Sequence, residues 1–205
     1  MKTEITAIIL AGGSSSRMGE NKALLNIGGK TVLEIILEKL KMVFKNLLLI
    51  TNNQDEFNKF GIKIYEDIFP GYGPLSGIHS GLTYSSTKIN FFISCDLPLI
   101  SIEAIKYIIE YKTQKPIVLY RHKNYVEKLC GIYTKDCLKE AEKLLSESSK
   151  IVDTGKQNVS MSSLISACEK EIIEFEKLPF YSNNTFLNMN TKEDYSKITK
   201  IMTQK

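Results

Sequence analysis

The stretch from Ile5 to Lys22 constrains the fold more than any other, because a short apolar run there ends abruptly in glycine and serine. The run Ile5 to Leu10 is rich in β-branched residues and carries no charge. Such a run is typical of a central strand that is covered on both faces of a sheet. We therefore predict an α/β fold with a ligand site where this strand ends.

The residues after this strand suit a phosphate group. Gly12 and Gly13 leave the backbone open to a ligand, and consecutive N–H groups in such a turn can converge on phosphate oxygens. Arg17 and Lys22 add positive charge. The spacing matches neither the Walker pattern nor the dinucleotide pattern G-x-G-x-x-G. It favours a phosphate-binding loop of another kind, and the alternative is an ordinary glycine turn with surface cations.

The next segments predict a parallel sheet. Thr31 and Glu34 have the spacing of a capping box, which starts a helix, and Leu47 to Thr51 follows as a second strand. A strand, helix and strand in this order give a right-handed crossover between parallel strands. Further strands are expected at Ile62 to Tyr65, Asn90 to Ser94, Ile117 to Tyr120, Leu129 to Tyr133, Ile172 to Phe175 (at an edge) and Phe186 to Met189. Helices are expected at Phe57 to Phe60, Ile78 to Tyr84, Ser101 to Tyr111 and Lys135 to Ser146. A last helix is expected from Thr191 onward, where Asp194 completes a second capping box.

Other segments lack a regular pattern. Ile68 to Gly77 contains several glycines and prolines, which predicts a rigid loop that shapes a pocket. Residues 146 to 163 are polar and contain glycine, which favours a mobile segment. Neither segment is expected to contribute a strand to the sheet.

Bulk properties exclude several classes of protein. The 205 residues fit one domain, which we place at residues 1 to 205. The net charge of +4 does not require a nucleic-acid partner, and the apolar stretches are too short for a membrane span or a secretory signal. The four cysteines contain no C-x-x-C pair and are expected to be buried, reduced thiols. These features predict a cytoplasmic protein with neither a nucleic-acid nor a membrane partner.

Charged residues near predicted strand ends suit transfer of a nucleotidyl group. Arg17 and Lys22 can neutralise a pyrophosphate leaving group. Asp96 can hold Mg²⁺, which prefers one or two carboxylates together with phosphate oxygens. Asp67 can bind the base or the ribose or assist the metal. Plainer interpretations remain open, namely a helix-capping role for Asp96 and a solvated turn carboxylate for Asp67.

The polar residues outside this set are less specific. Asn188 and Asn190 lie two residues apart and so share one face of the predicted strand, where ligand binding and turn formation are equally compatible with the sequence. His79 and His122 are interpreted as structural or surface residues, because neither has a ligand spacing from a cysteine.

The motif Leu10-Ala11-Gly12-Gly13-x-Ser15-x-Arg17-Met18-Gly19-x-x-Lys22 resembles the signature of nucleotidyltransferases that move a nucleoside monophosphate from an NTP onto a phosphate. Over most of the chain, further segments resemble the molybdenum cofactor guanylyltransferases, in that family's order. The resembling segments are Leu10 to Leu25, Glu66-Asp67, Gly73 to Gly77, Cys95 to Pro98, Leu129 to Tyr133 and Phe186 to Thr191. The resemblance implies a Rossmann-like, nucleotide-binding α/β fold of the nucleotide-diphospho-sugar transferase type, with a mostly parallel sheet and helices on both faces.

The resemblance also implies roles for individual residues. It places Lys22 on the phosphates, Asp67 near the nucleoside and Asp96 on Mg²⁺. Asn188 and Asn190 match a pair near the pterin of the acceptor. The other nucleotide-binding positions that it implies are Leu10, Ala11, Gly12, Gly13, Asn52, Gly73, Pro74 and Gly77.

We therefore expect the chain to transfer GMP from GTP to the terminal phosphate of molybdopterin cofactor, with Mg²⁺, and to form molybdopterin guanine dinucleotide and pyrophosphate. The expected protein partners are a molybdenum-insertion protein and acceptor molybdoenzymes or their chaperones. Two alternatives stay open: a cytidylyltransferase acting on molybdopterin or on a sugar or polyol phosphate, and a GTP-binding adaptor or cofactor carrier without turnover. The chain departs from the family at Lys192, where a proline is usual, and over Lys150 to Pro179, which has no clear counterpart.

Overall fold

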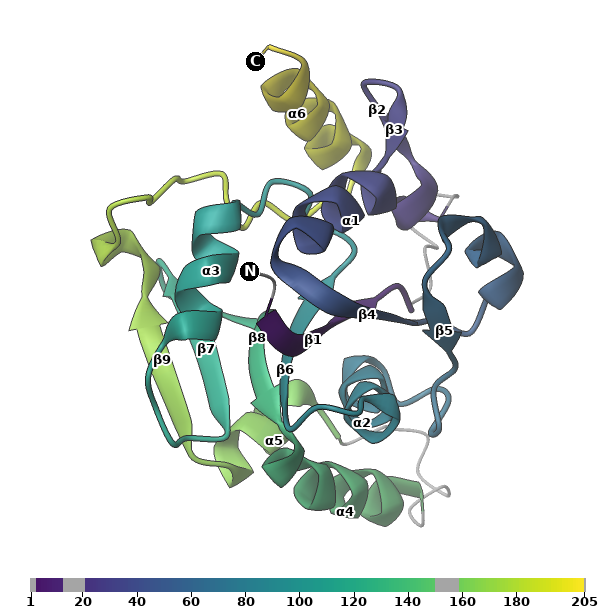
Figure 1. Ribbon diagram of the computed structural model, residues 1–205, viewed down its shortest axis with the longest axis vertical. Helices are drawn as coiled ribbons and strands as arrows, with labels where there is room; N and C mark the ends of the chain where they lie inside the picture. Colours follow the sequence, from purple (N-terminus) through teal and green to yellow (C-terminus); the bar gives the residue numbers. More distant parts are fainter. Residues whose placement is uncertain (1–2, 13–20, 150–158, 205) are drawn as a thin grey trace.

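The computed structural model describes residues 3–12, 21–149 and 159–204, and its described strands form a seven-stranded sheet and a two-stranded hairpin (Figure 1). The large sheet has the order β5-β4-β1-β6-β8-β7-β9, and only β8 runs antiparallel to its neighbours. Its strands are β1 (Thr3–Leu10), β4 (Phe44–Ile50), β5 (Lys63–Tyr65), β6 (Ile89–Ser94), β7 (Ile117–His122), β8 (Tyr125–Thr134) and β9 (Lys170–Glu174), and the hairpin pairs β2 (Asn26–Ile27) with β3 (Lys30–Thr31). The mostly parallel sheet is confirmed, with β9 at an edge as predicted.

Helices cover both faces of the large sheet. They are α1 (Val32–Val43), α2 (Pro74–Tyr84), α3 (Ile102–Glu110), α4 (Leu138–Ser149), α5 (Met161–Ala167) and α6 (Lys192–Thr203), with short 3₁₀ turns at Lys22–Leu24, Gln54–Glu56, Asn58–Phe60, Lys135–Cys137 and Phe175–Lys177. Helices α2, α4 and α5 gather on one face, at the bottom of Figure 1, whereas α1 and α3 cover the other. The predicted α/β class is therefore confirmed.

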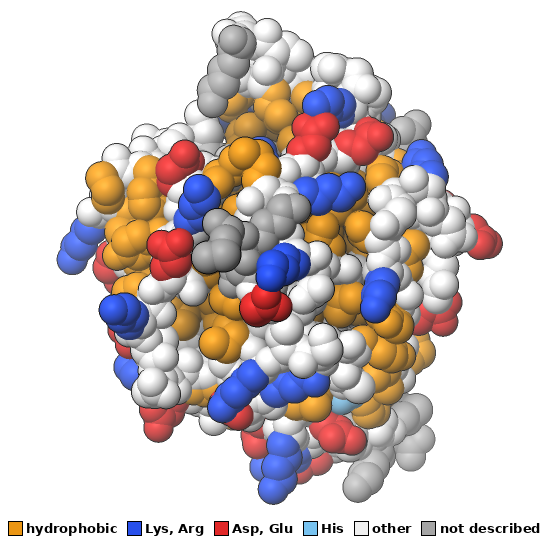
Figure 2. All heavy atoms as spheres, in the orientation of Figure 1, with side chains coloured by type: hydrophobic (Ala, Val, Ile, Leu, Met, Phe, Trp, Pro, Cys, Tyr) orange, Lys and Arg blue, Asp and Glu red, His pale blue; other side chains and the backbone are white. Residues whose placement is uncertain are grey.

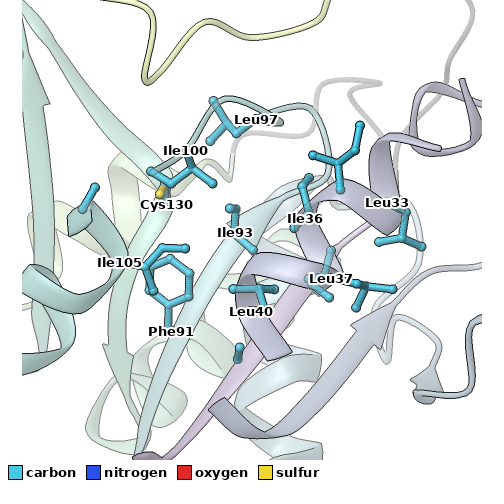
Figure 3. Close-up of a cluster of buried hydrophobic side chains, with 14 of the residues drawn as sticks. Leu33, Ile36, Leu37, Leu40, Phe91, Ile93, Leu97, Ile100, Ile105 and Cys130 are labelled. Atoms are coloured by element: carbon cyan, nitrogen blue, oxygen red, sulfur yellow. The ribbon is translucent and has the colours of Figure 1, made fainter. Parts of the chain in front are cut away.

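β1 joins the two hydrophobic layers, because its successive side chains point to opposite faces. Ile9 packs in the layer under α1, and Ile8 packs in the layer under α2, both fully buried. In the first layer, Leu33, Ile36 and Leu40 of α1 lie against β6 (Figure 3). Truncating one such leucine to alanine costs about 2–5 kcal/mol, so this layer fixes α1 on the sheet.

Both predicted capping boxes are present. The Glu34 backbone N–H donates to Thr31 Oγ1 over 3.2 Å, and the Thr31 N–H donates to Glu34 Oε2 over 2.6 Å. Thr191 and Asp194 make the same pair of bonds at the start of α6. These bonds satisfy backbone donors that the first turn of a helix otherwise leaves unpaired.

The prediction of a loop over Ile68 to Gly77 is wrong in its second half, because α2 begins at Pro74. Proline is favourable there, since the first helical residue has no intrahelical use for its N–H, and Gly73 supplies a φ of +62° just before it. Gly81 also lies inside this helix, and a larger residue would not fit there, because a Cβ would stand 2.6 Å from the Phe92 ring. The glycines of α2 therefore serve close packing as well as turning.

The strand predicted at Phe186 to Met189 is absent from the described structure. Successive turns replace it, with the Thr185 N–H bonded to the Ser182 carbonyl and the Leu187 N–H bonded to the Asn184 carbonyl. The two asparagines at positions 183 and 184 favour such turns because their side chains compete for backbone partners. The segment thus approaches the sheet without joining it.

The predicted mobile segment at residues 146 to 163 is helical at both ends, where α4 runs to Ser149 and Ser160 caps α5. Its middle, residues 150–158, lies outside the described residues. The cysteines are free; Cys130 and Cys137 are buried as predicted, whereas Cys95 and Cys168 are only partly covered. Within the described ranges, no helix is both long and apolar enough to cross a membrane.

Candidate functional site

The carboxyl ends of β1, β4 and β6 meet at one edge of the sheet. The Ala11 N–H donates to the Ile50 carbonyl over 3.0 Å, and the Cys95 N–H donates to the Leu10 carbonyl over 3.1 Å. These bonds hold the end of β1 between its two neighbours, with Leu10 and Ala11 buried. The residues that follow the three strands are therefore brought together, as expected for a ligand site in an open α/β sheet.

On one side of this edge, four residues form what we call the Asp67 cluster: Gly12, Asn52, Asp67 and Gly77. Asn52 Nδ2 donates to Asp67 Oδ2 over 3.0 Å, and the Asp67 N–H donates back to Asn52 Oδ1 over 3.0 Å. A Cβ on Gly12 would lie 3.9 Å from Asp67 Oδ2, and one on Gly77 would lie 3.8 Å from Asp67 Oδ1. All four are predicted nucleotide-binding positions, and the structure places them in contact.

The Asp67 carboxyl group is only partly paired. Burial raises its pKa, and the Asn52 amide and Ser76 hydroxyl oppose this rise. Its Oδ1 atom is buried without a hydrogen-bond partner among the described residues. One oxygen of this carboxyl group is therefore held by Asn52 and the other remains available to a ligand.

On the other side lies a cavity of about 480 Å³, which we call the Asp96 cavity. The N-terminus of α2 contributes to its wall through Gly73 and Pro74, and a helix N-terminus favours anions. The remaining lining residues are Tyr72, Leu75, Ser94, Asp96, Leu97, Tyr125, Glu127, Lys128, Leu129, Val159, Ser160, Met161, Asn188 and Asn190. The predicted positions Gly73, Pro74, Asp96, Asn188 and Asn190 thus share one cavity.

Asp96 is fixed by the chain that leaves β6. Leu97 and Ile100 pack into the layer under α1 (Figure 3), and Lys39 Nζ donates to the Ile100 carbonyl over 2.9 Å. Burial raises the pKa of Asp96, against the opposing effects of the Ser94 hydroxyl and the Lys22 ammonium. Asp96 Oδ1 is buried without a partner in the described part of the chain. A buried, unpaired carboxylate oxygen in the wall of a cavity fits a Mg²⁺ ligand, so Asp96 is the residue that would hold the ion.

Lys22 begins a 3₁₀ turn, and its side chain contacts Asn190, which lines the Asp96 cavity. Asn21 caps the turn, with its Oδ1 accepting from the Ala23 N–H over 3.2 Å. Lys22 Nζ donates to Asn190 Oδ1 over 2.7 Å, which joins residues 168 positions apart. The predicted phosphate-binding lysine and one of the predicted substrate-binding asparagines are therefore in direct contact.

The asparagine pair is anchored by its neighbours. Between the two asparagines, the fully buried Met189 donates its N–H to the Asp96 carbonyl over 3.0 Å. The Asn190 N–H donates to Asp194 Oδ2 over 3.0 Å, so the capping residue of α6 also positions this segment. Asn188 and Asn190 face the cavity because of these bonds, although the strand predicted for them is absent.

Two predicted residues, Gly13 and Arg17, lie outside the described residues. Their predicted roles remain predictions. On the face shown in Figure 2, Lys and Arg side chains are interspersed with Asp and Glu side chains, so surface charge there does not indicate a binding site.

Sequence reasoning missed Glu127, which lines the Asp96 cavity from β8 and is 8% exposed. Burial and the neighbouring Asp96 charge raise the pKa of Glu127 to about 7. The predicted strand began only at Leu129, which excluded this residue, whereas β8 begins at Tyr125. The signal available in the sequence was a glutamate that adjoins the apolar run beginning at Leu129.

The fold and site define a class: a nucleoside-triphosphate transferase on a mostly parallel α/β sheet. Residues 7–160 match the family model of the MobA-like NTP transferase domain. The chain belongs to this family and, within it, to the molybdenum cofactor guanylyltransferases, as its motifs suggested. It is a nucleotidyltransferase.

Relatives and solved structures agree with this assignment. The chain is 36% identical to a "Probable molybdenum cofactor guanylyltransferase" of Carboxydothermus hydrogenoformans, over 98% of both chains. It is 34% identical to a protein of the same name from Clostridium perfringens, over 95% of this chain and 96% of that one. A crystal structure of molybdopterin-guanine dinucleotide biosynthesis protein A from Archaeoglobus fulgidus shares the fold, with a TM-score of 0.81, 20% identity and coverage of 98% and 100%.

Proposed function

We propose that the chain transfers GMP from GTP to the terminal phosphate of molybdopterin cofactor. The observation that supports this proposal most directly is that Lys22 and Asp96 lie beside one cavity at the carboxyl edge of the sheet. Within the described structure, Asp96 Oδ1 is buried there without a hydrogen-bond partner. The names of the relatives from Carboxydothermus hydrogenoformans and Clostridium perfringens support the choice of substrates.

In the proposed reaction, an oxygen of the acceptor phosphate attacks the α-phosphorus of GTP. The new P–O bond forms as the bond from the α-phosphorus to the bridging oxygen breaks, and pyrophosphate leaves with the bond electrons. The Lys22 ammonium stabilises the charge that builds on the leaving group, so no protein nucleophile is needed. Mg²⁺, when bound at Asp96, would neutralise charge on the triphosphate.

The two sides of the site take different substrates in this proposal. The Asp67 cluster holds the nucleoside, because its backbone is open at Gly12 and its carboxyl group has one free oxygen. Asn188 and Asn190 hold the acceptor in the Asp96 cavity. Gly13 and Arg17, which lie outside the described residues, are assigned to phosphate binding from the sequence. This division aligns the acceptor phosphate with the α-phosphorus between the two sides.

The test is release of pyrophosphate by the purified chain with GTP, Mg²⁺ and molybdopterin cofactor. The Lys22→Ala variant should lower the rate by about a hundredfold or more, because one charge-stabilising contact is lost. Lys30→Ala is the matched control, since Lys30 is exposed and forms a surface ion pair with Glu38 at 2.7 Å. The proposal fails if the wild type releases no pyrophosphate or if Lys22→Ala matches the control.

A thermal-shift comparison of GTP with CTP, both with Mg²⁺, tests the base. A ligand that binds only the native state raises the melting temperature by mass action. We expect the larger shift with GTP, and a larger shift with CTP would indicate a cytidylyltransferase. Saturable GTP binding without pyrophosphate release would indicate an adaptor or carrier.

A further inference from the structure

Glu127 is a buried charged group to which the proposed reaction gives no role. Its side chain is 8% exposed and has no hydrogen-bond or ion-pair partner among the described residues, yet it lines the Asp96 cavity. Burying a carboxylate without a partner is unfavourable, and buried polar groups are normally paired. An unpaired carboxylate in a cavity wall is therefore arranged for a ligand that brings its own donors.

A bulge in β8 carries Glu127 to this wall. The pairing of β7 with β8 passes from Leu119 opposite Gly131 to Arg121 opposite Val126, so β8 has extra residues between these pairs. Such bulges re-aim side chains, and they are common beside active sites. The position of Glu127 is thus a consequence of an irregularity in the strand.

The bulge is stabilised by two hydrogen bonds of Lys128, the residue after Glu127, one to its carbonyl group and one from its side chain. The hydroxyl of the buried Tyr133 donates to the Lys128 carbonyl over 2.6 Å, and Lys128 Nζ donates to Ser162 Oγ over 2.8 Å. The first bond ties the bulge to its own strand, and the second ties it to α5. The Glu127 backbone is therefore held independently of any ligand.

The cavity around Glu127 suits a flat ring joined to a phosphate. Tyr125 is 66% exposed at its rim, and Tyr72, Leu97 and Met161 add apolar surface. Aromatic side chains and apolar walls bind planar rings through stacking and area burial. Lys22 reaches the same cavity through Asn190 and supplies a cation for a phosphate.

We propose that the Glu127 carboxylate binds the aminopyrimidinone edge of the acceptor's pterin ring and thereby selects pterins over related rings. The 2-amino group and the adjacent ring N–H are parallel donors, which match the two oxygens of a carboxylate as an arginine fork does. This inference rests on the proposed function. Guanine has the same edge, and the predicted nucleotide-binding positions Gly73 and Pro74 line the same cavity as Glu127. The choice of the pterin rests on Asn188 and Asn190, which also line this cavity, and on the assignment of the nucleoside to the Asp67 cluster.

The test uses two fluorescent probes, 6-hydroxymethylpterin monophosphate and the matching lumazine, in which an oxygen replaces the 2-amino group. Titrations of the full chain with Mg²⁺ should show that the wild type prefers the pterin by about tenfold or more, because one charge-assisted hydrogen bond distinguishes the probes. Glu127→Gln should reduce this preference to about twofold or less, because the amide replaces one acceptor with a donor. Glu110→Gln, an exposed change on α3, is the matched control and should keep the preference.

The inference is overturned if the wild type binds neither probe or binds both equally, or if Glu127→Gln keeps the pterin preference. A changed Mg²⁺ requirement with an unchanged preference would make Glu127 a metal ligand instead. Loss of the preference for GTP over ITP, which lacks the 2-amino group, would place the nucleotide base at Glu127. Either result would also overturn the inference.

The same variants separate this inference from the proposed function. Pyrophosphate release from GTP and the natural acceptor, without pterin selection by Glu127, would overturn only the inference. A pterin preference that depends on Glu127, without pyrophosphate release, would overturn only the proposed transfer. Because glutamine keeps the shape of the side chain and removes a buried charge, Glu127→Gln is expected to fold.

Discussion

The Asp67 cluster and the Asp96 cavity lie at the same edge of the sheet but hold their carboxyl groups differently. Asp67 makes two hydrogen bonds with Asn52, one through its side chain and one through its backbone. In the described structure, Asp67 Oδ1 and Asp96 Oδ1 are both buried without a partner, and Glu127, 8% exposed, lines the Asp96 cavity. On the first side the protein thus pairs one oxygen of the carboxyl group, whereas on the second side Asp96 and Glu127 are left for metal and acceptor.

This difference has an energetic consequence. Buried carboxyl groups that are not fully paired destabilise the fold, and the raised pKa values of Asp67, Asp96 and Glu127 express that penalty, which the Asn52 amide reduces at Asp67. Functional sites commonly retain such penalties because the ligand removes them. The comparison therefore predicts that substitutions in the cavity lower activity while preserving or raising stability, and that substitutions in the cluster weaken nucleotide binding.

The largest effect is expected from Asp96→Asn. We expect the turnover rate to fall by about a thousandfold, because a preorganised charge at the reacting phosphates is lost. Pyrophosphate release measures the rate, and thermal unfolding should show equal or greater stability because a buried, unpaired charge is removed. Asp136→Asn, which removes an exposed ion pair with Lys88 at 3.2 Å, is the control and should leave the rate unchanged. A variant that retains near-normal turnover would remove Asp96 from the site.

A smaller effect is expected from Asn52→Ala, which removes both hydrogen bonds to Asp67. Affinity for GTP should fall by about tenfold, since a hydrogen-bonded, partly buried carboxyl group loses its partner. Calorimetric titration with GTP measures the affinity, and the KM for the acceptor should stay unchanged. Asn53→Ala, a change to the exposed neighbour, is the control.

The corresponding variant on the acceptor side of the site is Asn188→Ala, in the Asp96 cavity. It should raise the KM for the acceptor by about tenfold and leave GTP affinity unchanged, because it removes a polar contact from the acceptor side. Steady-state rates at several acceptor concentrations measure this KM. If both asparagine variants weaken GTP binding alike, the division of the site into two sides is wrong.

Much of the fold was predictable because local and global signals agree. The apolar run of β1, the capping boxes at Thr31 and Thr191, and the strand at β6 each follow from residue types whose local preference matches their place in the fold. The start of α2 was mispredicted because Gly73, Pro74 and Gly77 were interpreted as turn formers. In the structure, Gly77 and Gly81 are instead required by close contact with Leu10 and Phe92, which only the tertiary packing reveals.

The site was predictable where residues follow regular strands and unpredictable where they follow irregular ones. Asn52, Asp67 and Asp96 each come after a strand, so their meeting at one edge follows from the parallel sheet. Glu127 lies in a bulge, whose register depends on contacts such as Tyr133 with the Lys128 carbonyl. Asn188 and Asn190 were identified from the family resemblance. They were expected to share one face of a strand, but this strand is absent from the described structure.

The smallest effect concerns His79, which lies in α2, the helix that contributes to both sides of the site. It is 4% exposed, packs edge-on against Phe69 with ring centroids 5.0 Å apart, and has a buried Nδ1 without a partner among the described residues. Burial lowers its pKa from the usual 6.5, against the opposing charge of Glu142. Because the unfolded chain then takes up a proton before the folded one, stability is lost as the pH falls below about 6.5.

The His79→Phe variant keeps an aromatic ring beside Phe69 but cannot take up this proton. Between about pH 7.5 and pH 5.5 it should lose about 1 kcal/mol less stability than the wild type, as measured by urea unfolding at both pH values. The buried His122, whose pKa is also lowered chiefly by burial, still contributes its own acid sensitivity in this variant. An identical pH dependence in wild type and variant would show that His79 has the same pKa in the folded and unfolded chains. That result would mean that burial in α2 does not oppose protonation of the ring, which would contradict the acid sensitivity expected here.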